Sequence, residues 1–161
     1  MTIYNVQPWP STYNMKGDVA PTKLTSRFEG RTVGAFRGGI PPHTVEPPQV
    51  HLLAPRDGNP FEELLTGFDK PLVVAYWDAV TRETRIREYS PGHDIAIPEF
   101  RVHWLINPYN VELEFTCEFA PSPWDGDLDE PEFPNLDALI QYVDEKGLRE
   151  RLIEANGNYP R

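Results

Sequence analysis

Residues 111–119, with the sequence VELEFTCEF, alternate strictly between apolar and polar side chains. A period of two with one polar face is typical of an antiparallel strand that packs against a core on one side. The pattern therefore predicts a strand with one apolar face and one polar face. The apolar face carries Val111, Leu113, Phe115, Cys117 and Phe119, and the solvent-facing side carries Glu112, Glu114, Thr116 and Glu118.

An apolar run at residues 70–79, KPLVVAYWDA, predicts a buried strand, because it is rich in β-branched and aromatic residues. The following segment, residues 81–90, predicts its hairpin partner. Residues 89–110 read as turn, short strand, Pro98, short strand and turn. Short strands separated by turns are typical of a sandwich or a small barrel.

Three segments before residue 70 give weaker signals. Residues 31–39 and residues 49–53 predict two further strands. Residues 61–68, FEELLTGF, are instead typical of one short helical turn that Gly67 closes. Residues 1–30 show little periodicity and are expected to form an extended N-terminal arm.

After residue 120 the pattern changes from strands to helices. A proline-rich acidic loop leads to Asn135, a favourable N-cap, and apolar residues follow at helical spacing up to a stop at Gly147. A second short helix is predicted to end at Gly157. We expect a mostly β fold with one or two C-terminal helices. Residues 31–120 would form the barrel, and residues 121–161 the acidic loop and the helices packed on it.

Composition narrows the choice of partner. With 161 residues, 39% of them hydrophobic and 25% charged, the chain is expected to form one globular domain. A formal net charge of −10 without a basic cluster argues against nucleic acid and against an acidic membrane surface. Eighteen prolines divide the chain into short pieces, which favours strands.

The expected compartment is the cytoplasm. Cys117 is the only cysteine, so no internal disulfide can form, and a reducing environment is indicated. The first residues do not show the pattern of a signal peptide, and the longest apolar run is far shorter than the roughly 20 residues of a membrane-spanning helix. The extended arm and an exposed sheet edge favour a homodimer.

His103 is the main candidate for chemistry. In the strand after Pro98, Arg101, His103 and Leu105 share one face, and the bulkier set Val102, Trp104 and Ile106 takes the other. The bulkier set is the better partner for an adjoining layer. We therefore expect Arg101 and His103 to point into the mouth of a barrel.

The spacing of Gly92, Pro98, His103 and Asn107 resembles the second conserved motif of the cupins, which are double-stranded β-helix barrels of the jelly-roll type. Phe100 stands where the family usually has a second glycine. The resemblance covers roughly residues 70–120. It implies a cupin-like jelly-roll barrel in which His103 is a metal ligand. The first cupin motif, with its His-x-His pair, has no counterpart in this chain.

The resemblance implies that the other metal ligands come from upstream. His51 and Glu46 would complete an atypical centre with His103, and Glu62 or Glu63 are alternative carboxylates. Imidazole and carboxylate groups suit Fe, Mn, Ni or Zn. The spacing of these residues does not require such a centre.

A second interpretation needs no metal. Residues 36–43, FRGGIPPH, are loosely similar to the Arg-Gly-x-His stretch of cupin-like sugar-nucleotide epimerases, with Arg37 and His43 as counterparts. His103, His51 and His43 could then transfer protons next to a carbonyl group. Arg101 or Arg37 could hold an anionic group of the substrate, and Tyr76 could line the pocket mouth.

These features predict a small-molecule enzyme that transfers protons on a polar, carbonyl-bearing metabolite, as an isomerase, epimerase or lyase. A metal-dependent cupin dioxygenase is the alternative enzyme. A non-catalytic ligand-binding or assembly module, with a barrel filled by side chains, is the alternative without catalysis.

Overall fold

The structure is a computed structural model, and it describes residues 7–8, 34–52, 60, 62–120 and 133–157. The strands of these residues form two sheets. The first sheet has the order β1 (Gln7–Pro8), β3 (Thr44–Val45), β8 (Val102–Asn107), β5 (Leu72–Asp78) and β6 (Glu83–Tyr89). The second has the order β2 (Gly34–Ile40), β9 (Leu113–Ala120), β4 (Glu62–Thr66) and β7 (Ile95–Pro98).

The strand pairs are nested inside one another. β2 pairs with β9, β3 with β8, β4 with β7 and β5 with β6, all antiparallel, as in one long hairpin. The hairpin is rolled up, so that β4 also meets β9 and β5 also meets β8. This is the topology of a jelly roll, and it confirms the predicted fold class.

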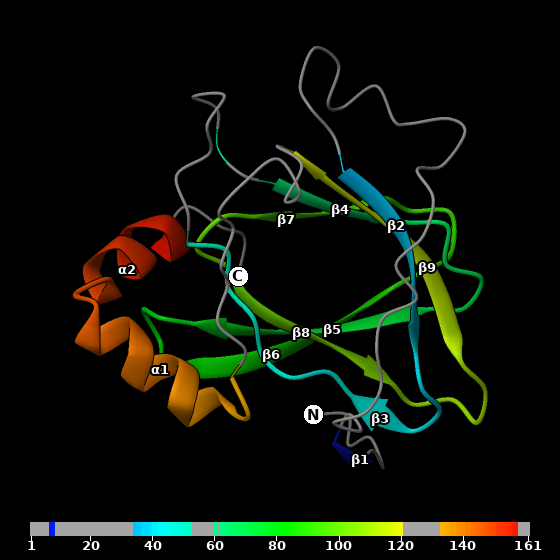
Figure 1. Cartoon of the computed structure of the whole chain (residues 1–161), viewed down its shortest axis with the longest axis horizontal. Coiled ribbons are helices and arrows are strands. Elements are labelled where there is room, and N and C mark those ends of the chain that lie inside the picture. Colours follow the sequence, from blue (N-terminus) through cyan, green and yellow to red (C-terminus); the bar gives the residue numbers. More distant parts are fainter. Residues whose placement is uncertain (1–6, 9–33, 53–59, 61, 121–132, 158–161) are drawn as a thin grey trace.

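The main core lies between the two sheets, which form the upper and lower layers in Figure 1. Leu65 and Ile97 enter it from the second sheet, and Val74 and Leu105 enter it from the first. Alternation along each strand places every second side chain in this core. On β8, His103 and Leu105 therefore share the inner face, as the sequence predicts.

The two C-terminal helices, α1 (Leu136–Glu145) and α2 (Arg149–Gly157), lie at one end of the jelly roll (Figure 1). A second apolar cluster joins Leu139 and Leu152 to Trp77 and Val102 of the first sheet. The side chain of Asn135 accepts a hydrogen bond from the backbone N–H of Ala138 at 2.9 Å. The predicted N-cap and helices are confirmed.

One predicted element is wrong. The predicted helical turn is not formed in the described part of this segment, because Glu62–Thr66 is strand β4, with β9 on one side and β7 on the other. Leu64 and Leu65 are buried on opposite faces, so the segment lacks the alternation of a half-exposed strand. Gly67, at φ 69°, follows the end of the strand.

Two smaller expectations also fail. The predicted strand at residues 49–53 is an isolated bridge between Gln49 and His103 in its described part. Pro47 and Pro48 just before it have no N–H to donate to a ladder. Alternation predicts that Glu118 faces solvent, but it is only 2% exposed.

Most of the expected N-terminal arm and most of the acidic loop lie outside the described residues. From the arm, Gln7–Pro8 pairs in parallel with Thr44–Val45. The predicted boundaries of the arm, barrel and C-terminal region stay predictions. Among the described residues, no helix is both long and apolar enough to cross a membrane.

Candidate functional site

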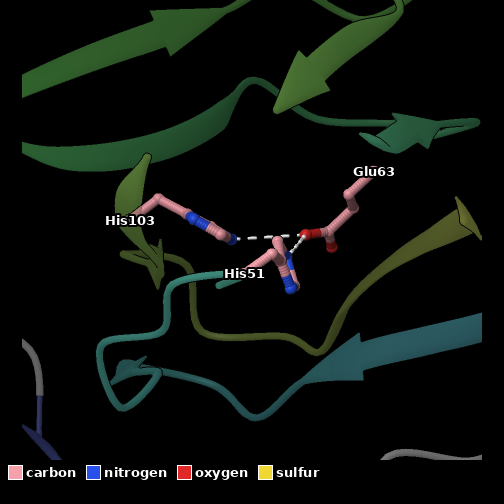
Figure 2. Close-up of side chains that lie close together, drawn as sticks. All are labelled: His51, Glu63 and His103. Carbon is pink, nitrogen blue, oxygen red and sulfur yellow. Dashed lines mark hydrogen bonds and ion pairs between the residues drawn. The ribbon is translucent and has the colours of Figure 1, made fainter. Parts of the chain in front are cut away.

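Two histidines and one glutamate converge inside the jelly roll (Figure 2). One potential ligand atom from each of His51, Glu63 and His103 lies within 4.8 Å of the other two. His51 follows β3, Glu63 lies on β4 and His103 lies on β8, so the cluster joins the two sheets. All three side chains are buried.

The strand register explains why these side chains meet. Glu63 lies opposite Ile97 and Phe119, and it faces inward by alternation. His103 lies opposite Tyr76 on one side and bridges to Gln49 on the other, with two backbone hydrogen bonds to that residue. This bridge holds Gln49 beside His103, and His51 is two residues further along the same segment. The ring centroid of His51 is 5.3 Å from that of His103.

The hydrogen bonds of His103 fix its tautomer. Its Nδ1 lies 2.7 Å from the carbonyl oxygen of Arg101. A carbonyl oxygen only accepts, so Nδ1 must carry the hydrogen and donate it. In a neutral imidazole, Nε2 then has a lone pair and no hydrogen.

That lone pair faces an anion. Nε2 of His103 lies 3.3 Å from Oε2 of Glu63. The contact lacks hydrogen-bond geometry, so this buried nitrogen has no hydrogen-bond partner among the described residues. A lone pair and a carboxylate oxygen repel each other unless a cation or a proton lies between them. The arrangement therefore calls for either a bound metal or a protonated His103.

Glu63 is a carboxylate at neutral pH. Burial alone would raise its pKa, but the proximity of His103 and His51 outweighs burial and lowers the pKa well below its usual range. Nε2 of His51 lies 2.8 Å from Oε2, the same oxygen that faces His103. The other oxygen, Oε1, accepts a hydrogen bond from the Cys117 thiol at 3.1 Å.

The donor set fits a divalent transition metal. Two imidazoles and one carboxylate are the protein ligands of several catalytic zinc and iron sites. Metal-binding histidines usually donate their second ring N–H to a carbonyl or carboxylate, as His103 does to Arg101. The Nε2 atom of His103, which has no hydrogen-bond partner among the described residues, is the atom that would coordinate.

Glu46 is not the carboxylate of this cluster, although the sequence makes it the candidate ligand. Glu63 takes that place. Oε1 of Glu46 accepts a hydrogen bond from the backbone N–H of Leu105 at 3.3 Å. Burial, reinforced by the charge of Glu63, raises the pKa of Glu46 to about 8, so its protonated form dominates at neutral pH.

His43 does not join the cluster of described residues. His43 is exposed in a turn, with a φ of 51° and its backbone N–H bonded to the carbonyl of Tyr109. The proposed catalytic role of His43 therefore has no support from its position. Arg37 lies opposite Thr116 in the β2–β9 ladder, and its side chain is outside the described part of the structure.

Arg101 and Tyr76, the other predicted substrate-binding residues, lie together beside the cluster. The guanidinium carbon of Arg101 is 4.6 Å from the centroid of the Tyr76 ring. Tyr76 is directly opposite His103, and its hydroxyl lies 3.0 Å from that of Tyr89. Burial raises the pKa of Tyr76 well above its usual range, so the phenol stays protonated.

The motif residues around His103 are structural. Gly92 has a φ of 90°, and the Asn107 amide donates to the carbonyls of Ile40, Pro41 and Val111. Phe100, which stands where the cupin pattern has glycine, adopts a φ of 59°. This chain keeps the left-handed conformation that favours glycine. The Phe100 N–H donates to the His51 carbonyl at 2.9 Å, which helps to place His51.

Replacing Phe100 by alanine and by glycine should separate two contributions to stability, the packing of its ring and the strain of its left-handed backbone. The ring is 5% exposed and packs with the helices. Phe100→Ala should lose about 3–5 kcal/mol of unfolding free energy, because it removes this packing. Phe100→Gly loses the same packing but relieves about 1 kcal/mol of left-handed strain, so it should be more stable than the alanine variant. Urea denaturation of both variants measures this, and an alanine variant as stable as the glycine variant would refute it.

Sequence reasoning misses two members of the site. Glu63 is only an alternative ligand there, because the unalternating EELL segment is typical of a helix. Cys117 is predicted on the apolar face of its strand, and it is indeed fully buried, but its contact with Glu63 depends on the β4–β9 pairing. A strand assignment for residues 62–66 would have placed Glu63 and Leu65 on one face.

Comparisons with known proteins give similarities of fold only. No family model matches the chain, and no curated protein matches it. Among solved structures, the polyketide cyclase RemF of Streptomyces resistomycificus matches with a TM-score of 0.48 and 14% identity, over 72% of this chain and 70% of its own.

Two further solved structures have cupin-type names. A double-stranded β-helix protein of Klebsiella pneumoniae has a TM-score of 0.47 and 14% identity, with 80% of this chain and 90% of its own covered. A cupin domain of Bordetella pertussis has a TM-score of 0.40 and 16% identity, over 58% and 86%. The nested strand order itself makes the fold a jelly roll.

Proposed function

We propose that this cupin-type jelly roll is a metal-dependent enzyme that acts on a small carbonyl-bearing metabolite. His51, Glu63 and His103 would hold one divalent transition metal. The observation that carries the proposal is the Nε2 atom of His103, a buried nitrogen without a hydrogen-bond partner among the described residues, 3.3 Å from a carboxylate oxygen. A cation at this point would pair with both atoms.

The number of protein ligands favours catalysis over a purely structural metal. Structural zinc sites usually have four protein ligands, whereas catalytic ones have three and leave a position for water or substrate. When bound, a divalent metal would act as a Lewis acid that polarises a substrate carbonyl. His51, Glu63 and His103 supply three donors from the described residues.

Arg101 is the proposed anchor for an anionic group of the substrate. It lies two residues before His103 and stacks on Tyr76, which is opposite His103. A guanidinium group suits a carboxylate or phosphate, because it donates two parallel hydrogen bonds. A substrate held there would have its neighbouring carbonyl on the side of the histidines. This supports proton transfer next to a carboxylate or phosphate group.

A metal-dependent oxygenase is the second candidate function. Two histidines and one carboxylate are also the ligand set of non-haem Fe(II) oxygenases, and this chain brings that set together. The same three residues would hold the iron.

Isotope exchange can distinguish proton transfer from oxygenation without knowledge of the natural substrate. Metal-free protein would be loaded in turn with Zn, Mn, Ni and Fe(II) and incubated in D₂O with small carboxylated or phosphorylated carbonyl compounds. We expect proton NMR to show metal-dependent loss of the signal of the α-hydrogen, and an Arg101→Gln variant to need more substrate for the same rate. Oxygen uptake without exchange would support the oxygenase. Neither reaction with any metal would contradict an enzyme of this class.

A further inference from the structure

We propose that Cys117 is a positioning residue for Glu63. Its thiol would hold one carboxylate oxygen, so that the other oxygen alone faces the two imidazoles. This inference rests on the proposed metal centre and names a residue that acts on the centre through its carboxylate ligand.

The geometry assigns the two oxygens of Glu63 to different partners. Oε1 accepts from Sγ of Cys117 at 3.1 Å. Oε2 lies 2.8 Å from Nε2 of His51 and 3.3 Å from Nε2 of His103. The contact of Oε1 therefore leaves Oε2 as the oxygen directed at both imidazoles.

Strand pairing places the thiol in reach of Glu63. Cys117 lies directly opposite Leu65 in the β4–β9 ladder, and Glu63 is two residues from Leu65 on the same face. Such diagonal neighbours are within reach of one another across a strand pair. Cys117 is fully buried, so no solvent competes for Oε1 at that side.

Cys117 is not itself part of the ligand cluster. Among the described residues, the donor atoms within 4.8 Å of one another come from His51, Glu63 and His103, and Sγ is not one of them. The role that remains for the thiol is to fix the rotation of the carboxylate. Such contacts behind a metal ligand typically change metal affinity by about 10–100-fold.

The first test compares the zinc affinities of three proteins with that of the wild type, by competition with a chelator. Cys117→Ala removes the donor and should weaken zinc binding by about 10-fold or more. Cys117→Ser keeps a donor and should bind zinc more tightly than Cys117→Ala, with an affinity close to that of the wild type. Val74→Ala is the packing control, because it removes volume from the same core cluster but no hydrogen-bonding group.

These affinities separate positioning from packing. If Cys117→Ala and Val74→Ala have similar melting temperatures without metal, but only Cys117→Ala binds zinc weakly, the thiol positions Glu63. Equal zinc affinity in Cys117→Ala and the wild type would overturn the inference. Weak binding by Cys117→Ser, as weak as that of Cys117→Ala, would overturn it too.

A second test does not need metal. Cys117 is the only cysteine, so the S–H stretching band in the infrared spectrum belongs to this residue alone. We expect Glu63→Gln to move the band of the metal-free protein to higher frequency, because an amide is a weaker acceptor than a carboxylate. An unmoved band would contradict the thiol–carboxylate contact.

The two tests also separate this inference from the proposed function. A wild-type protein that binds no metal, but whose S–H band moves in Glu63→Gln, would overturn the metal centre and leave the contact intact. A wild-type protein that binds zinc tightly, together with a Cys117→Ala variant that binds it equally, would overturn the positioning role alone.

Discussion

Replacing His103 by glutamine should lower the affinity for a divalent transition metal by at least about 100-fold. Losing a contact that only supports a metal ligand already costs up to about this factor, and His103 is a proposed ligand itself. His103 supplies one of three ligands, and its Nε2 is the one without a hydrogen-bond partner among the described residues. Glutamine keeps much of the volume of the buried side chain, which favours a folded variant. Chelator competition measures the affinity, and circular dichroism confirms the fold.

His43→Asn is the matched control for this variant. His43 is exposed in a turn at positive φ, which asparagine tolerates, and it is outside the cluster. Its metal affinity should equal that of the wild type. If His103→Gln also binds metal as the wild type does, His103 is not a ligand and its 3.3 Å contact with Glu63 reflects a protonated imidazole instead.

The free energy of unfolding of the metal-free protein should fall as the pH rises from about 5 to about 8, because Glu46 holds its proton in the folded state. The pKa of its buried carboxyl is raised from 4.5 to about 8 in the folded protein. In this window the folded state keeps the proton and the unfolded chain releases it. Unfolding is therefore favoured by rising pH, with a slope of up to about 1.4 kcal/mol per pH unit. The stabilisation is complete below pH 4.5 and is lost as the pH passes about 8.

Glu46→Gln isolates this effect. The amide resembles the protonated carboxyl and can still accept from the backbone N–H of Leu105. Urea denaturation of both proteins between pH 4.5 and 9, with a chelator present, should give curves that diverge in favour of the glutamine variant as the pH rises. Parallel curves would mean that Glu46 ionises in the folded protein with an ordinary pKa.

Local patterns are enough to predict the parts of the fold with one clear amphipathic or apolar signature. β5 is a continuous apolar run, and α1 has a favourable N-cap and helical spacing. β4 escapes prediction because it is buried on both faces between β9 and β7. Nothing within EELLT shows that two distant strands flank it, since both partners are supplied by the rolled hairpin.

Part of the site can also be predicted, because a local pattern along the chain places some of its residues. The inward face of His103 follows from alternation on β8, and the sequence also indicates His51 as its partner. The carboxylate cannot be chosen from the sequence, because Glu46, Glu62 and Glu63 are all close to His51 along the chain. The pairing of β4 with β9 and β7 decides that Glu63 points inward.

Phe100 shows how a departure in sequence can hide an agreement in structure. The residue differs from the glycine of the cupin pattern, but its backbone keeps a φ of 59°. Its ring packs beneath the guanidinium of Arg151, 4.4 Å from the ring centroid, and the side chain of Asn156 donates to its carbonyl. These contacts with α2 hold a conformation that glycine would adopt without strain.

X-ray absorption on the zinc-loaded wild-type protein tests the metal centre most directly, when the metal content of the same sample is measured. We predict one zinc ion per chain, bound by two imidazole nitrogens and at least one oxygen, with no sulfur ligand. A protein that retains no zinc after dialysis, or a spectrum with a sulfur ligand or without imidazole, would contradict the assignment of His51, Glu63 and His103 as a metal centre.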